Sequence, residues 1–184
     1  MNNSFKRIFS FCFEIGQTFV LAAAIFVVIY MLAAQLHQVQ GSSMEPNFQN
    51  GDYILTEKIS FRFRSPKRGE IIIFKAPNSD REYIKRVIGE PGETIKIYNN
   101  AIYIINKKLT EQYIEAHTFS GSYLRENQEL IISSDSFFVM GDNRPRSSDS
   151  RAFGPVPIQD IIGKVFFRYF PTHRIGTIGR LYNQ

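Results

Sequence analysis

The pattern of apolar and polar residues changes abruptly after residue 34. Residues 18–34, TFVLAAAIFVVIYMLAA, carry no charge, and residues 8–13 add further apolar positions before them. An apolar run of this length can cross the roughly 30 Å hydrocarbon core of a bilayer as a helix. The pattern predicts a single transmembrane helix, and we assign residues 1–36 to a cytoplasmic N-terminus and membrane anchor.

Basic residues predict the orientation of this helix. Lys6 and Arg7 precede it, and the next Lys or Arg is Lys58. Because basic residues favour the cytoplasmic side of a membrane, the N-terminus is expected in the cytoplasm and the rest of the chain outside. A cleaved secretory signal ending near Ala33 and Ala34 is the alternative, but the length of the apolar run favours a retained anchor.

After the apolar run, the hydrophobic pattern is typical of a β-rich domain. In residues 94–105, TIKIYNNAIYII, apolar residues alternate on both sides of Asn99 and Asn100, a pair that tolerates the positive φ of a tight hairpin turn. Other strand candidates, bounded by turn residues, are DYILTEKI, GEIIIFKAP, EYIKRVIG and SFFVMG. We predict a mainly β, antiparallel, barrel-like catalytic domain over residues 37–184.

Two segments of this domain lack a clear strand pattern. Residues 107–135 are more polar and irregular, and we expect them to form a surface excursion. PIQDIIG, at 157–163, has weak helical periodicity. These segments do not change the predicted fold class.

Aromatic and basic residues are interspersed in ISFRFRSPKR, at 59–68, and in KVFFRYFPTHRIGTIGR, at 164–180. The first stretch could be an edge strand, and Phe166, Phe167 and Phe170 of the second could belong to the core. Rings and basic groups on one surface also suit lipid headgroups. The lipid bilayer is therefore a candidate partner.

Composition narrows the kinds of site that the chain can hold. Its 184 residues suffice for one well-buried domain. Cys12 is the only cysteine, which excludes an intramolecular disulfide and a cysteine-based zinc site. His37, His117 and His173 are scattered without ligand spacing, so no metal is expected. The net charge of +5 suits nucleic acid or an anionic membrane and does not distinguish them.

Ser43 is a candidate nucleophile just beyond the apolar run. A serine hydroxyl needs a neighbouring base, usually histidine, but His37 would lie roughly 20 Å away on an extended chain. Lys85 stands among apolar residues of a candidate strand, a setting that lowers a lysine pKa. By spacing alone, an ordinary solvent-facing strand residue is the better interpretation of Lys85.

Three motifs in order point to one family. GSSMEP, YIKRVIGEPGE and MGDNRPRSSDSRAFGPV follow the apolar helix, and together they closely resemble the motifs of type I signal peptidases (leader peptidases), which use a serine and lysine dyad. The resemblance extends over residues 15–170. It implies a membrane-bound serine endopeptidase that uses no cofactor.

The resemblance implies a role for each matching residue. Ser43 would be the acylating nucleophile, and Lys85 the general base that later protonates the leaving amine and activates the hydrolytic water. Ser147 would hydrogen-bond to the lysine and orient it. The other supporting residues would be the ion pairs Asp149 with Arg151 and Asp142 with Arg86, and Gly141, which lets the backbone approach the site. Without the resemblance, residues 141–151 would be interpreted as a solvated turn.

The sequence departs from the family pattern at Gly41, where many members carry a hydroxyl that helps to hold the tetrahedral oxyanion. The backbone N–H of Ser43 can still serve, while Ser42, on a strand, would face the other way. Asn47 replaces the usual threonine, and residues 145–146 vary the third motif. Neither change touches a proposed catalytic group.

The implied substrates are preproteins with signal peptides, cleaved after small residues on the outer face of the cell inner (plasma) membrane. An extended peptide would add as a strand between the segment leading into Ser43 and the strand that carries Lys85. We expect Met44, Tyr83 and Ile84 to form a shallow apolar pocket there, although all three could instead be ordinary core.

Three other functions compete with this one. LexA-like self-cleaving repressors resemble the chain in Ser-Met and a downstream lysine, but they would carry a helix-turn-helix in place of the apolar run. A non-enzymatic, membrane-anchored β-domain that binds peptides would use the motifs only as turns. Nucleic-acid binding lacks a recognisable motif, so no nucleic acid is expected as a partner. The oligomeric state stays open.

Overall fold

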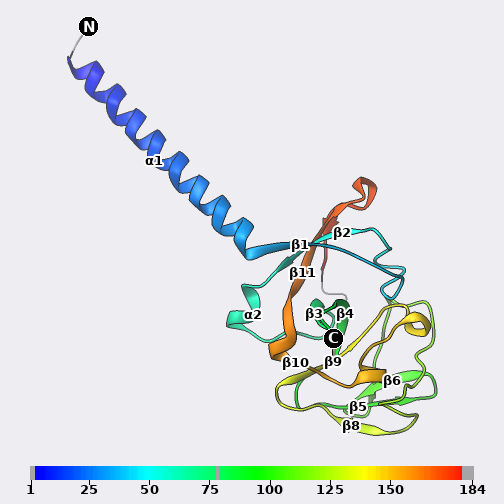
Figure 1. Ribbon diagram of the computed structural model, residues 1–184. Helices are drawn as coiled ribbons and strands as arrows, with labels where there is room; N and C mark the ends of the chain where they lie inside the picture. The colour runs from blue at the N-terminus through cyan, green and yellow to red at the C-terminus, as the bar shows by residue number, and fades with distance from the viewer. Residues whose placement is uncertain (1–2, 78, 180–184) are drawn as a thin grey trace. The chain divides into compact units, whose positions relative to one another are not determined.

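The computed structural model describes residues 3–77 and 79–179. The chain forms two compact units, Met1–Gln35 and Leu36–Gln184. The first unit contains helix α1 (Asn3–Ala33), and the second contains the β-sheets (Figure 1).

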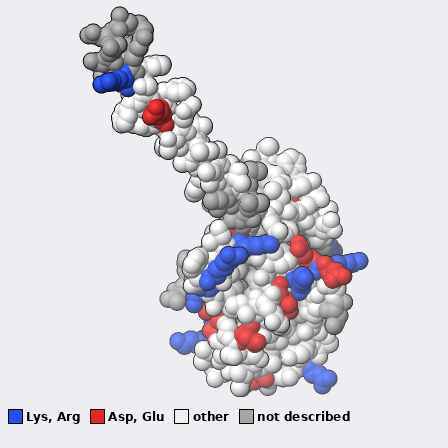
Figure 2. Space-filling model, turned by 60° about the vertical axis from the view of Figure 1, so that its left-hand side comes forward, with Lys and Arg blue, Asp and Glu red and all other residues white. Residues whose placement is uncertain are grey.

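Helix α1 contains a stretch that is long and apolar enough to cross a membrane. This stretch is Phe9–Val28, with a mean hydropathy of 2.0, and it begins earlier than the predicted span of residues 18–34. After Glu14 the helix has no charged residue, and its surface in Figure 2 is correspondingly free of colour. Ala34, the last residue of the predicted span, already belongs to strand β1.

Two sheets build the second unit (Figure 1). The larger has the strand order β1-β2-β11-β3-β4-β9-β10, with β12 beside β11, and the smaller has the order β7-β6-β5-β8. The strands of the larger sheet are β1 (Ala34–Gln38), β2 (Tyr53–Glu57), β3 (Ile71–Lys75), β4 (Glu82–Gly89), β9 (Ser136–Met140), β10 (Val156–Pro157), β11 (Ile161–Phe170) and β12 (Gly176–Thr177). Those of the smaller sheet are β5 (Thr94–Tyr98), β6 (Ala101–Ile104), β7 (Lys107–Lys108) and β8 (Glu129–Ile131). Short helices α2 (Ser60–Phe63) and α3 (Ser150–Phe153) and 3-10 turns η1 (Arg144–Arg146), η2 (Ile158–Asp160) and η3 (Thr172–Arg174) lie between strands.

The mainly β, antiparallel prediction is confirmed, and the barrel-like closure is wrong. Neighbouring strands from β2 to β10 pair antiparallel. Closing a barrel requires the two end strands to pair with each other, but among the described residues β1 and β10 do not pair. Strand β10 has only two residues, both engaged by β9, and β5 to β8 form a separate sheet.

The predicted strands are present, and the hairpin is confirmed. Strands β5 and β6 pair antiparallel around Asn99 and Asn100, whose φ angles are 48° and 60°.

Strand β3 begins with the apolar sequence IIIF because both of its faces are covered. Ile71 and Ile73 pack in one apolar cluster, and Ile72 and Phe74 pack in another. An interior strand with two buried faces has no position for a polar residue.

Three segments differ from their sequence patterns. Residues 107–135 contain β7 and β8 and bury several side chains, so they pack into the domain as well as covering it. The buried residues are Leu109, Tyr113, Thr118, Leu124 and Ile132. Only Ile158–Asp160 of PIQDIIG is helical, and β11 begins directly after it. Within residues 59–68, Ser60–Phe63 form the short helix α2, and no residue of this stretch belongs to a strand.

The second aromatic stretch lies largely in the interior strand β11, between β2 and β3. Phe166 and Phe167 are half-buried, and Phe170 is exposed. Arg168 donates hydrogen bonds to the Asn47 carbonyl at 2.7 Å and to Asp52 at 3.0 Å. Much of this stretch is therefore structural, and its arginine ties β11 to the turn that follows β1.

Candidate active site

Ser43 lies in a tight turn between β1 and β2. The Glu45 N–H donates to the Ser42 carbonyl, and the Phe48 N–H donates to the Met44 carbonyl at 2.8 Å. The side chains of Met44 and Phe48 are fully buried in the cluster with β2, β3 and β11. These two anchors fix the turn on the sheet and leave Ser43 at the surface of a cleft.

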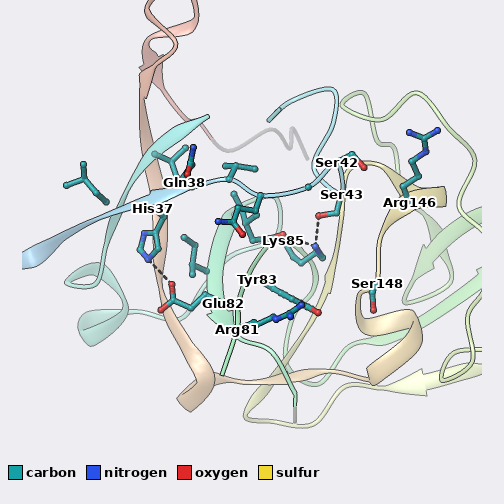
Figure 3. A pocket seen from close by; sticks show the side chains of 17 residues that line it. His37, Gln38, Ser42, Ser43, Arg81, Glu82, Tyr83, Lys85, Arg146 and Ser148 are labelled. Atoms are coloured by element: carbon teal, nitrogen blue, oxygen red, sulfur yellow. Dashed lines mark hydrogen bonds and ion pairs between the residues drawn. The ribbon is translucent and has the colours of Figure 1, made fainter. Parts of the chain in front are cut away.

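Strand β4 brings Lys85 to this serine. The Nζ atom of Lys85 lies 2.8 Å from Ser43 Oγ and donates to the Ile84 carbonyl at 3.0 Å (Figure 3). The lysine is only 4% exposed. A buried amine in hydrogen-bond contact with a serine hydroxyl is the arrangement that a general base requires.

The surroundings of Lys85 favour its neutral form. Burial lowers the pKa of Lys85 to about 8, because the apolar interior penalises the charged ammonium. The nearby Asp149 and Asp142 carboxylates raise the pKa and so oppose this effect, while Arg151 lowers it. At pH 7 roughly a tenth of the amine is therefore unprotonated and able to accept a proton, a far larger share than for a free lysine.

Two buried ion pairs hold the segment after β9 against the site. Arg86, next to Lys85, forms two hydrogen bonds with Asp142, at 2.8 and 2.6 Å. Asp149 accepts from Arg151 Nε at 2.8 Å and from the Gly141 N–H at 3.1 Å. Both ion pairs expected from the resemblance are present: the Arg86–Asp142 pair pins this segment to β4, and the Asp149–Arg151 pair lies within the segment.

Gly141 lies where no side chain fits. A Cβ at this position would lie 2.3 Å from Ser147 Oγ and 2.4 Å from the Ser43 carbonyl oxygen. The close approach of the Gly141 backbone to the site, which the resemblance implied, is thus required by packing. It allows the backbone after β9 to lie against the serine turn.

Ser147 does not make the hydrogen bond expected from the resemblance. Its Oγ is buried and has no hydrogen-bond partner among the residues that the structure describes. Lys85 Nζ instead contacts Ser43 and the Ile84 carbonyl. The lysine is therefore oriented by its own strand in this structure.

A cleft of about 880 Å³ opens between residues 36–43 and residues 81–85, with Arg146 and Ser148 at its border. Tyr83 and Ile84 line it, as expected. Met44 does not, because its side chain points into the core. The cleft lies between the two segments where a substrate strand was predicted to add.

His37 lines the same cleft but does not contact Ser43. Its Nε2 lies 3.1 Å from Glu82 and its Nδ1 lies 3.0 Å from Thr56 Oγ1 (Figure 3). Both ring nitrogens are thereby engaged. The exclusion of His37 as the base for Ser43 agrees with this geometry.

Gly41 itself provides no side-chain donor for an oxyanion. Gly41 has a φ of +86°, which favours glycine, and its N–H donates to Asn50 Oδ1 at 2.8 Å. Ser42 lines the cleft beside Ser43, contrary to the expectation for a strand, because both residues lie in a turn. The Ser43 N–H has no acceptor among the described residues.

The sequence interpretation missed four polar contacts around the site. Asn143 donates to the carbonyls of Ser42 and Ser43, and Asn47 Nδ2 donates to Asp142 at 2.9 Å. Arg144 forms an ion pair with Glu111. Asn143 and Arg144 stand within the third motif, which could have drawn attention to them, whereas Glu111 lies in an irregular segment with no local signal.

Comparisons with known proteins show which family the chain resembles. Residues 12–170 match the family described as signal peptidase, peptidase S26. The chain is 37% identical over 171 residues to a probable signal peptidase I-2 of Synechocystis sp., covering 90% of this chain and 76% of the relative. It is 36% identical over 173 residues to a signal peptidase I of Leptolyngbya laminosa, covering 90% and 81%. A crystal structure of a signal peptidase I from Enterococcus faecalis V583 matches with a TM-score of 0.48 and 32% identity, over 55% of this chain and 97% of that chain. Given the extent of the family match and of the Synechocystis relative, the chain belongs to the signal peptidase, peptidase S26 family.

Proposed function

We propose that Ser43 and Lys85 are the nucleophile and general base with which this serine endopeptidase removes signal peptides from preproteins. The observation that carries the proposal is the 2.8 Å contact between Lys85 Nζ and Ser43 Oγ. Burial, which lowers the pKa of the same amine to about 8, supports it further. No other base contacts the hydroxyl among the described residues.

In the acylation step, neutral Lys85 accepts the proton of Ser43 Oγ while the oxygen attacks the scissile carbonyl. The tetrahedral oxyanion then receives a hydrogen bond from the Ser43 N–H, which has no other acceptor among the described residues. As the carbon–nitrogen bond breaks, the Lys85 ammonium returns its proton to the leaving amine. The signal peptide remains as an ester on Ser43.

In the deacylation step, Lys85 is again neutral and accepts a proton from water. The resulting hydroxide attacks the ester carbonyl, and the same N–H stabilises the second oxyanion. Collapse of this intermediate returns the proton from Lys85 to Ser43 Oγ. The signal peptide leaves as a free carboxylate, and the enzyme regains its starting state.

The substrate binds as an added strand in the cleft between residues 36–43 and 81–85. Its backbone pairs with these segments, and alternate side chains face the walls. Tyr83 and Ile84 line the cleft close to Lys85, which favours small side chains next to the scissile bond. Met44 supports this wall from the core and does not contact the substrate.

Helix α1 anchors the enzyme, with residues 1–36 as cytoplasmic N-terminus and membrane span and residues 37–184 as the peptidase domain on the outer face of the cell inner (plasma) membrane. The helix has the length and composition for this role, and Lys6 with Arg7 precedes its apolar part. Exposed Ile59 and Phe63, next to Arg62 and Arg64, provide a surface for lipid headgroups.

The test is cleavage of a preprotein with an Ala-x-Ala site by the full-length, detergent-solubilised protein. Ser43→Ala and Lys85→Ala should each lower kcat by about 10⁴-fold or more, with circular dichroism unchanged. Ser42→Ala is the matched control, because this hydroxyl lines the same cleft without contacting Lys85. Cleavage by Ser43→Ala at the wild-type rate would show that the nucleophile is assigned wrongly.

A further inference from the structure

Asn143 holds the peptide group that contains the Ser43 N–H. Its side-chain Nδ2 donates to the Ser42 carbonyl at 3.0 Å. Its own backbone N–H donates to the Ser43 carbonyl at 3.0 Å. One residue of the segment after β9 thus restrains the carbonyls on both sides of the nucleophile's backbone.

The direction of the Ser43 N–H follows from this restraint. The Ser42–Ser43 peptide is planar and trans, because cis bonds occur among the described residues only before Pro46 and Pro171. In a trans peptide the C=O and the N–H point in opposite directions. A hydrogen bond that holds the Ser42 carbonyl therefore also fixes where the Ser43 N–H points.

Asn143 acts from outside the catalytic cleft. The cleft is lined by Ser42 and Ser43 but not by Asn143. Asn143 instead lines a separate cavity of about 270 Å³ with Glu45, Pro46, Gln49, Glu115, Ala116 and Asp142. Its carboxamide is therefore placed to orient the peptide without touching a substrate in the cleft.

We propose that Asn143 is a positioning residue for the oxyanion site, because its carboxamide aims the Ser43 N–H at the scissile carbonyl oxygen. The inference rests on the proposed role of Ser43 as nucleophile. Gly41 supplies no hydroxyl to share the charge, so the site depends heavily on this N–H. A misdirected donor costs transition-state stabilisation even when substrate binding is intact.

Kinetics of the full-length Asn143→Ala variant test this role. Loss of the Nδ2 contact should lower kcat by about 10- to 100-fold, somewhat less than loss of a whole oxyanion donor, and change KM by less than about twofold. The backbone N–H of residue 143 remains and still holds the Ser43 carbonyl. The pH midpoint of kcat/KM should stay at the wild-type value, since the Lys85 contacts are unchanged.

A pair of peptide inhibitors separates oxyanion binding from substrate binding. A peptide aldehyde ending in alanine forms a hemiacetal with Ser43 Oγ, so its former carbonyl oxygen occupies the oxyanion position. The matching peptide alcohol lacks an electrophilic carbon and reports ground-state binding alone. Asn143→Ala should weaken the binding of the aldehyde by about tenfold or more and the binding of the alcohol by less than about twofold.

Asn47→Ala is the matched control for a general loosening of the turn. Asn47 Nδ2 also links the serine turn to its surroundings, through Asp142 and the Tyr113 carbonyl, but it contacts neither carbonyl that flanks the Ser43 nitrogen. This variant should lower the Tm while keeping the wild-type ratio of aldehyde to alcohol affinity.

Asn143→Asp keeps the side-chain shape but removes the amide donor. It should reproduce the loss of kcat and of aldehyde affinity seen in Asn143→Ala, and it replaces the alanine variant if that variant fails to fold.

Two results would overturn the inference: kcat of Asn143→Ala or Asn143→Asp within about twofold of wild type, or an equal loss of aldehyde and alcohol affinity. Failure of the dyad has a different signature, because Ser43→Ala would then keep its activity and the aldehyde would bind no better than the alcohol to the wild-type enzyme.

Discussion

At the scale of single residues, the chemistry of the site depends on the burial of Lys85. An exposed lysine is almost fully charged at neutral pH, and a charged amine cannot accept the proton of Ser43. Strand β4 places the amine in the interior, and the carboxylates of Asp142 and Asp149 limit how far its pKa falls. Lys85, the proposed general base, is thus neutral enough to act and basic enough to be effective.

The pH dependence of cleavage follows from this pKa. Because only neutral Lys85 can accept a proton, and its pKa is lowered to about 8, kcat/KM should rise with pH to a plateau, with a midpoint near that value. The measurement is cleavage of a peptide substrate in detergent from about pH 6 to pH 10. A rate independent of pH over this range would contradict the role of Lys85.

Gly141→Ala tests the close approach of the backbone to the serine. The added Cβ would lie 2.3 Å from Ser147 Oγ and 2.4 Å from the Ser43 carbonyl oxygen, so the serine turn or its neighbour must shift. A shift of about 1 Å in a catalytic group can lower the rate by about 100-fold, and we expect kcat to fall to that extent. Gly176→Ala is the control for a general effect, since a Cβ there contacts nothing within 4 Å and the φ of this glycine is not in the positive range.

At the scale of secondary-structure elements, β4 and the segment after β9 form one rigid pair. Arg86 on β4 and Asp142 just after β9 are both fully buried and share two hydrogen bonds. The guanidinium also lies 4.2 Å from the centre of the Tyr113 ring. This connection fixes the distance between the strand that carries Lys85 and the segment that contacts the serine turn.

Removal of one partner of the buried Arg86–Asp142 pair should therefore destabilise the domain strongly. Asp142→Ala leaves Arg86 buried without its carboxylate, and we expect the free energy of unfolding to fall by about 3–5 kcal/mol. Urea unfolding followed by circular dichroism measures this change. As a control, Glu129→Ala removes a pair on the outer surface, with Lys96, and should cost less than about 1 kcal/mol. Equal effects of the two substitutions would contradict the structural role of the buried pair.

At the scale of the whole molecule, the chain divides into an apolar helix and a domain with its own apolar clusters. Proposed membrane contact involves both parts, since the domain exposes Phe63 to 85% beside Arg62, the basic residue of α2. On the face of the domain that Figure 2 shows, Lys and Arg side chains are interspersed with Asp and Glu. The proposed contact with anionic headgroups therefore centres on Phe63 and Arg62.

Vesicle binding by residues 36–184 tests this contact. The fragment should keep a cooperative unfolding transition, because its clusters lie within it, and it should bind phosphatidylglycerol-containing vesicles more tightly than neutral ones. Phe63→Ser should weaken the binding by severalfold, or about 1–2 kcal/mol, on loss of a buried ring. Ile131→Ser, at a similarly exposed position on the smaller sheet, should leave vesicle binding unchanged. Equal binding of both variants would exclude helix α2 as the contact.

The sequence by itself determined the local elements and the chemical groups of the site. Uninterrupted apolar residues predicted a long apolar helix, and alternation around two asparagines predicted the β5–β6 hairpin, because both patterns follow from local backbone geometry and burial. Three motifs in order led to the signal peptidase family and to Ser43 and Lys85. Each of these patterns is formed by residues that lie close together in the sequence.

Tertiary packing decided what these groups contact. The 2.8 Å approach of Lys85 to Ser43 joins residues 42 positions apart and requires a turn anchored by buried Met44 and Phe48, which is also why Met44 is absent from the cleft. The sheet stays open because its two-residue end strand cannot close it. Such distances depend on how strands and turns pack against one another, and no local pattern encodes them.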